Sequence, residues 1–143
     1  MTKTLFEKIS PTLDKEHEKI FLAIDKVVAA ANKYWNNKNK RHLIMKACER
    51  LYKACEKHWK TEEKLFIKGQ KKMPQCHQSV KTDIDKHRKH HIKMLQRIQK
   101  IKDESMTKNP LKKILAIKRI CYENYLLYFK TRWRIRSTSK HFL

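Results

Sequence analysis

Residues 40–68, KRHLIMKACERLYKACEKHWKTEEKLFIK, indicate the fold more strongly than any other stretch. Apolar side chains recur there at intervals of three and four residues, which is the period of an amphipathic helix. His58 and Glu62 lie on the same apolar stripe, four residues apart. An imidazole and a carboxylate would therefore share one core-facing side of a helix. This pattern predicts a helical bundle with metal ligands in its interior.

Three other segments have the same helical period. Ser10-Pro11 predicts the start of the first, because a serine cap followed by a first-turn proline suits a helix N-terminus. Gly69 predicts the end of the second. Four helices with short connections predict an all-α fold, an up-down-up-down four-helix bundle, as one domain over residues 1–143. The expected helices cover residues 11–35, 40–68, 79–104 and 110–134.

Histidines on two of the other stripes complete a candidate metal site. If the first two helices pack antiparallel, His17 and His58 lie at the same height in the bundle. The reason is that the sequence midpoint between them falls in the predicted turn that joins these helices. The sequence midpoint between the His58/Glu62 pair and two histidines of the third helix falls near Pro74, in the next predicted loop. Antiparallel packing of the second and third helices therefore places these two histidines in the same layer. One histidine on an apolar face is usually a hydrogen-bonded core residue, but a buried glutamate is costly to ionise, and a metal removes that cost. The predicted ligands are His17, His58, Glu62, His87 and His91.

Three short motifs resemble those of the hemerythrin family. Residues 14–21, DKEHEKIF, resemble its first-helix signature, and residues 58–66, HWKTEEKLF, resemble its HFxxEExxM signature. Residues 87–91, HRKHH, resemble its HxxxH pair. The resemblance implies a four-helix bundle around an oxo-bridged di-iron centre that binds O2 reversibly, with five histidines and two bridging carboxylates.

The resemblance also implies a role for each candidate ligand. His17 and His58 would serve one iron. His87 and His91 would serve the other, and Glu62 would bridge the two ions.

The fourth helix departs from the family pattern. Residues 125–134, YLLYFKTRWR, are the counterpart of the family's WLxxHIxxxD. Phe129 stands at the histidine position and Arg134 at the position of the bridging aspartate. The site would then be an altered di-iron centre or a single-metal site. Glu63 and Glu123 are possible substitute carboxylates.

The third helix permits a second alignment. Counting from Glu62 at the family's usual separation leads to His77, whose partner four residues on is Lys81. The pair His87 and His91 requires a longer loop, and helix-capping residues between 79 and 85 favour it. His77 stays an alternative candidate.

The chain is strongly basic, with 36 Lys and Arg against 14 Asp and Glu and a net charge of +22. So large a charge attracts polyanions and predicts an anionic partner, either nucleic acid or an acidic protein. The alternative is a set of solvated helix faces that only keep the protein in solution.

Several features bear on compartment and activity. No apolar run approaches the roughly 20 residues of a membrane span, and the N-terminus lacks a signal-peptide pattern. Cys48, Cys55, Cys76 and Cys121 form no CxxC pair, so we expect reduced, mostly buried thiols. We therefore expect a soluble protein of the cytoplasm or another reducing compartment. Oxidative chemistry at an open iron position is a third-ranked alternative, and no nucleophile–base pair or phosphate loop supports other catalysis. We therefore expect that the protein is not an enzyme.

The leading hypothesis is a hemerythrin-like non-haem iron protein that binds or senses O2. The alternative is a metal-deficient hemerythrin-like scaffold that acts as a basic structural or nucleic-acid-associated protein.

Overall fold

The computed structural model describes the backbone of residues 5–72 and 78–123, and the side chains of residues 15–68, 81–82 and 84–123. A fourth α-helix begins at residue 111 and is described as far as residue 123. The labelled elements are α1 (Leu5–Tyr34), the 3-10 helix η1 (Lys38–Lys40), α2 (His42–Lys72) and α3 (Gln78–Glu104).

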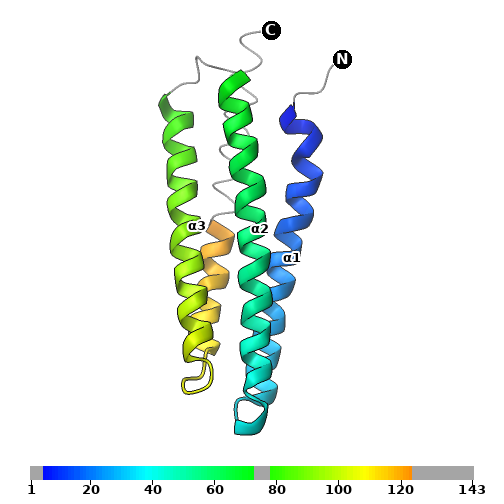
Figure 1. Ribbon diagram of the computed structural model, residues 1–143, viewed down its shortest axis with the longest axis vertical. Coiled ribbons are helices and arrows are strands. Elements are labelled where there is room, and N and C mark those ends of the chain that lie inside the picture. Colours follow the sequence, from blue (N-terminus) through cyan, green and yellow to red (C-terminus); the bar gives the residue numbers. More distant parts are fainter. Residues whose placement is uncertain (1–4, 73–77, 124–143) are drawn as a thin grey trace.

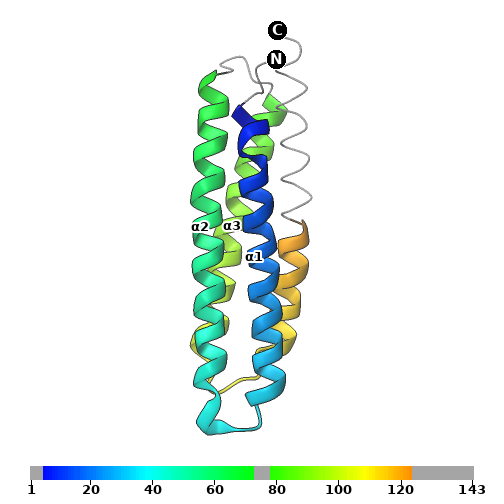
Figure 2. The same cartoon turned by 90° about the vertical axis from the view of Figure 1, so that its right-hand side faces the viewer.

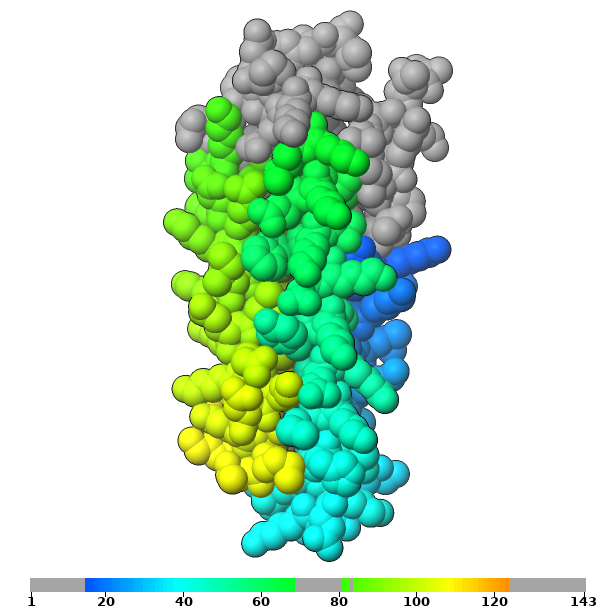
Figure 3. All heavy atoms as spheres, viewed as in Figure 1, coloured from blue at the N-terminus to red at the C-terminus, as the bar shows by residue number. Residues whose placement is uncertain are grey.

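The four α-helices of the described residues form an elongated up-down-up-down bundle (Figures 1 and 2). α2 packs against both α1 and α3 and lies between them on the face shown in Figure 3. The fourth helix closes the ring, because Lys118 pairs with Asp25 of α1 at 3.3 Å and Cys121 contacts Met94 of α3. The predicted all-α four-helix bundle is confirmed.

The half of the bundle nearest the α1–α2 connection has an aliphatic core. Each helix contributes apolar residues at three- and four-residue spacing, and burial of each side chain is worth about 1.5–3 kcal/mol. The members of this core that are at most 3% exposed include Ile24, Val27, Ile44, Leu51, Ile98, Ile101, Ile114 and Ile117.

Arg41 ties together the two connections at this end of the bundle. Its Nε donates a hydrogen bond to the carbonyl of Trp35 at 2.7 Å, and its Nη1 donates to the carbonyl of Met106 at 3.1 Å. The guanidinium also lies 3.6 Å from the centre of the Trp35 ring. One cation thus joins the segment after α1 to the segment after α3, which fixes how the two helical hairpins meet.

Two predicted helix ends are wrong. α1 begins at Leu5 rather than at residue 11, so Pro11 lies inside the helix. A proline removes one backbone hydrogen bond and can bend a helix without ending it. α2 continues to Lys72 past Gly69, because a glycine costs a helix only about 1 kcal/mol.

The other predicted ends lie close to those of the structure. α2 begins at His42 instead of residue 40, since Lys38–Lys40 form the 3-10 turn. α3 covers nearly the predicted range, from Gln78 to Glu104. The fourth helix starts next to the predicted residue 110, after Asn109 accepts a hydrogen bond from the Leu111 amide at 3.1 Å. Its predicted end at residue 134 lies outside the described residues.

None of the helices in the described part of the chain combines the length and the apolar character that crossing a bilayer requires.

Replacing Ile24 with alanine should lower the free energy of unfolding by about 2–5 kcal/mol, because the fully buried side chain leaves a cavity. Leu22→Ala is the matched control on the same helix, where the side chain is 58% exposed, and it should change stability by about 0.5 kcal/mol or less. Urea unfolding followed by circular dichroism measures both. Equal losses in the two variants would contradict this core.

Candidate metal centre

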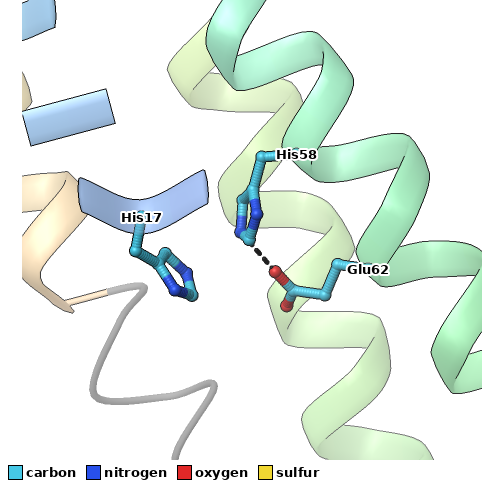
Figure 4. A group of neighbouring side chains, drawn as sticks. All are labelled: His17, His58 and Glu62. Atoms are coloured by element: carbon cyan, nitrogen blue, oxygen red, sulfur yellow. Dashed lines mark ion pairs between the residues drawn. The ribbon is translucent and has the colours of Figure 1, made fainter. Parts of the chain in front are cut away.

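The structure brings the five predicted ligands together inside the bundle. His17 comes from α1, and His58 and Glu62 come from consecutive turns of α2, as Figure 4 shows. His87 and His91 project from consecutive turns of α3. All five are buried, and none is more than 7% exposed. The four-residue spacing on α2 and α3 places each pair on one helical face, and the bundle turns these faces toward each other.

Glu62 lies at the centre of this layer. Its Oε2 is 2.5 Å from Nε2 of His58, the contact drawn in Figure 4, and 3.6 Å from Nε2 of His91. Its Oε1 contacts Nε2 of His87. The two oxygens of one carboxylate therefore each approach a different imidazole.

Two groups of possible ligands overlap at Glu62. One contains His17, His58 and Glu62, and the other contains Glu62, His87 and His91. Within each group the ligand atoms lie within 4.8 Å of one another. Metal–ligand bonds of about 2.0–2.2 Å allow two ligands of one ion to lie up to about 4.4 Å apart. Each group thus fits one ion after a small adjustment, with Glu62 shared.

The polar side chains of this layer contact one another through ion pairs rather than through regular hydrogen bonds. Both oxygens of Glu62 and both ring nitrogens of His58, His87 and His91 are buried without a regular hydrogen bond to any described residue. Buried polar atoms normally have such partners. Imidazole and carboxylate donors that face a common centre fit a divalent cation.

The pKa values of two of these groups favour the protonation states that bind a cation. Burial, assisted by the charge of His58, lowers the pKa of His17 to about 3, so its imidazole is neutral. Burial opposes ionisation of Glu62, yet the charge of His87 and the contacts with His58 hold the pKa of this carboxyl well below its usual range. A neutral imidazole and an ionised carboxylate are the forms that bind metals.

His58 differs from His17 and His91, whose pKa values burial lowers. Burial lowers its pKa, but the contacts with Glu16 and Glu62 outweigh burial and raise the pKa to about 9. His58 therefore carries a proton at neutral pH in the metal-free protein, and an incoming cation must displace it.

Glu16 is a site residue that the sequence analysis missed. It is 8% exposed, and its Oε2 lies 3.6 Å from Nδ1 of His58, on the opposite side of the ring from Glu62. A carboxylate behind a ligating imidazole orients the ring and raises its basicity. The sequence hides this role, because Glu16 directly precedes His17 and neighbouring side chains point about 100° apart around a helix.

The possible substitute carboxylates lie elsewhere. Glu63 pairs with Arg88 at 3.4 Å and is about one-third exposed, and Glu123 is exposed. Lys81, the partner of the alternative ligand His77, is exposed as well.

Three positions from the sequence analysis cannot be placed against this site. His77, Phe129 and Arg134 lie outside the described residues.

Aromatic rings cover part of the histidine layer. Phe66 meets the ring of His87 edge-on at 5.6 Å, and Trp59 stacks on His91 with ring centres 6.5 Å apart. These rings hold the two imidazoles in place and exclude water from their sides.

The fold and the site define a helical bundle with an internal layer of His and Glu side chains that could hold a metal ion. Residues 8–127 match the family model described as Hemerythrin HHE cation binding domain, and the chain therefore belongs to the hemerythrin family. This confirms the resemblance seen in the three motifs. Comparisons with curated proteins and with solved structures gave no match.

Metal affinity should rise with pH between about 6.5 and 9 and then level off. His58 must be neutral to donate its lone pair, so below the raised pKa of about 9 each bound cation displaces a proton from this residue. Loss of one proton corresponds to roughly a tenfold gain in affinity per pH unit. Co2+ titrations against a competing chelator measure the slope. An affinity independent of pH over this range would contradict the protonated state of His58.

Replacing Glu16 with glutamine should lower the pKa of His58 in the metal-free protein, because it removes an anion next to Nδ1. Loss of such an orienting carboxylate typically weakens metal binding by about 10–100-fold. Histidine NMR titration and Co2+ binding above pH 9 measure the two effects. Glu18→Gln is the control, since Glu18 is exposed on the same helix. An unchanged His58 pKa in Glu16→Gln would show that Glu16 does not act on this ring.

Proposed function

We propose that this protein is a non-haem iron protein in which Glu62 bridges two ions and O2 is the small-molecule ligand. The observation that carries the proposal is the position of the Glu62 carboxylate. Its Oε2 faces His58 and its Oε1 faces His87, while His17 and His91 complete a group on each side.

The donor chemistry supports iron. Each group offers two imidazoles and one carboxylate oxygen, a set that suits Fe2+ and leaves coordination positions open. Family membership supports a cation at this place. When bound, iron supplies the redox-active centre at which O2 is taken up.

The chain's own residues account for the remaining properties of such a centre. Glu16 contacts Nδ1 of His58, the ring nitrogen that faces away from Glu62. Trp59 and Phe66 pack against the rings of the two α3 histidines. The surrounding core is apolar and admits a small apolar molecule more readily than an ion. We assign this centre to binding or sensing O2, and assign it no catalytic step.

The alternative is a scaffold without a metal. In that case the buried charge of Glu62 is balanced by the proton that His58 holds below about pH 9. The alternative thus predicts a stable histidine–carboxylate pair, and the two cases differ in metal content.

After anaerobic loading with Fe2+ and desalting, we expect two irons per chain by elemental analysis. His17→Ala should remove one iron, His91→Ala should remove the other, and Glu62→Ala should remove both, because only Glu62 belongs to both groups. His42→Ala is the control, since His42 is exposed.

One iron per chain, lost in His17→Ala and kept in His91→Ala, would replace the two-ion proposal with a single-metal site. Iron content unchanged by Glu62→Ala would refute the ligand set. The spectrum under air tests the O2 part separately, and no O2-dependent band in the iron-loaded protein would refute it.

A second function is proposed for the surface. Lys19, Lys26 and Arg50 surround an apolar groove between α1 and α2. A similar groove between α3 and the fourth helix is bordered by Arg97, Lys100 and Lys113. Lys113 pairs with Glu104 at 2.6 Å, but with 36 basic and only 14 acidic residues most cations have no acidic residue of their own. We propose that these faces bind polyanions.

Binding to DNA or RNA should show little sequence preference and fall steeply with salt, because lysines act as point charges that release counterions from phosphates. Fluorescence anisotropy at several salt concentrations measures the slope. Undetectable binding at about 0.15 M salt would refute the nucleic-acid proposal and leave the metal proposal intact.

A further inference from the structure

Three sulfur-bearing side chains from three helices meet in the core. Cys121 of the fourth helix donates a hydrogen bond from its thiol to Sδ of Met94 in α3, with the sulfur atoms 3.0 Å apart. Cys55 of α2 lies beside Cys121, and this contact together with burial raises the pKa of the Cys55 thiol well above its usual range. All three side chains are buried and at most 5% exposed. We call Cys55, Met94 and Cys121 the sulfur cluster.

The sulfur cluster lies next to the histidine layer. Cys55 precedes His58 by three residues, and Met94 follows His91 by three residues. Because α2 and α3 are antiparallel, both displacements point toward the same end of the bundle, by about 4.5 Å along the axis. The core thus contains a nitrogen and oxygen layer and, about one helical turn away, a sulfur layer.

Core packing alone explains a single buried cysteine or methionine, since both behave as small or flexible apolar residues. It explains Cys48, one heptad before Cys55, whose buried thiol contributes only to the apolar core. It does not require two thiols and a thioether to converge from three helices, where aliphatic side chains would fill the same space. Three soft donors that meet around Cys121 also provide what a soft metal ion requires.

We propose that Cys55, Met94 and Cys121 form a binding site for a soft monovalent cation of the Cu(I) type. Thiolate and thioether ligands select Cu(I) over the harder divalent ions. Zn2+ instead prefers four donors. Among the described residues, no imidazole or carboxylate joins these two cysteines in a group of possible ligands. Three sulfurs suit a cation of low coordination number.

Charge balance supports a monovalent ion. Binding of Cu(I) would release one thiol proton to solvent, so that one thiolate balances the single positive charge and the buried site is neutral; the thioether and the remaining thiol would be weaker, uncharged donors. A neutral site avoids the large cost of placing net charge in an apolar core.

The geometry requires a small expansion. Metal–sulfur bonds of about 2.3 Å in a threefold arrangement separate the sulfur atoms by about 4 Å. The contact between Cys121 and Met94 must therefore widen from 3.0 Å by about 1 Å. Methionine has three rotatable side-chain bonds and can make this change without moving a helix.

The two layers would then bind different classes of metal ion. The site of Glu62 and the four histidines takes a harder divalent ion, and the sulfur cluster takes the soft one. Because the sulfur cluster shares no ligand with the histidine layer, the two sites can be tested independently.

The test is an anaerobic titration of the full-length protein with Cu(I) against a chromophoric Cu(I) chelator. The expected result is one Cu(I) per chain, with affinity reduced at least about tenfold in Cys55→Ala and in Cys121→Ala. The double variant Cys48→Ala/Cys76→Ala is the control and should keep the site. Met94→Leu nearly conserves volume, so it should preserve folding and weaken binding about tenfold.

X-ray absorption at the copper edge provides the second readout. A first shell made only of sulfur, at about 2.3 Å, is expected. A shell containing nitrogen or oxygen would overturn the proposal. So would the absence of Cu(I) binding by the unmodified protein, or equal losses in the control and in Cys121→Ala. If folded Met94→Leu binds Cu(I) with unchanged affinity, Met94 is not a ligand and the proposed three-sulfur site is wrong.

Discussion

The buried charge of Glu62 is the constraint on which the rest of the structure depends. This carboxylate is 1% exposed and has no regular hydrogen bond to a described residue. An isolated charge in such a place would cost several kcal/mol. Imidazoles of three helices approach it in compensation, which fixes how α1 and α3 are positioned along α2. A cation between them would satisfy all of these groups together, and this is why we place the function here.

Stability and function are separated along the bundle axis. The end with the α1–α2 connection has an aliphatic core and the Arg41 contacts between the two hairpins. Those interactions stabilise the bundle without a ligand. The histidine layer can therefore keep its polar side chains buried, because the aliphatic half supplies the folding energy. Binding of a cation to the folded state alone would add to that stability by mass action.

Much of this structure could be predicted from local sequence patterns. Helical periodicity predicted the bundle. The positions of the predicted turns between antiparallel helices predicted that the histidines lie in one layer of it. The helix ends at Pro11 and Gly69 were wrong because a single helix-breaking residue costs less than the packing of a long helix provides. Such a balance depends on tertiary contacts, which a local pattern does not contain.

The features that could not be predicted from the sequence are contacts between side chains of different helices. Glu16 reaches His58 across the α1–α2 interface, from a position that periodicity alone assigns to another face. The sulfur cluster is similar, since Cys48 and Cys55 look alike along α2 and only the contact of Cys55 with Cys121 distinguishes them. Metal ligands with i, i+4 spacing are visible in one helix, whereas orienting residues and mixed clusters require the assembled bundle.

The most direct test of the central claim is a crystal structure of the iron-loaded protein with anomalous diffraction at the iron edge. If Glu62 bridges two ions, two anomalous peaks should flank its carboxylate, about 3.5–4 Å apart. One peak should lie beside His17 and His58 and the other beside His87 and His91. No peak within bonding distance of Glu62, with His58 still paired to it, would contradict a metal centre in this bundle.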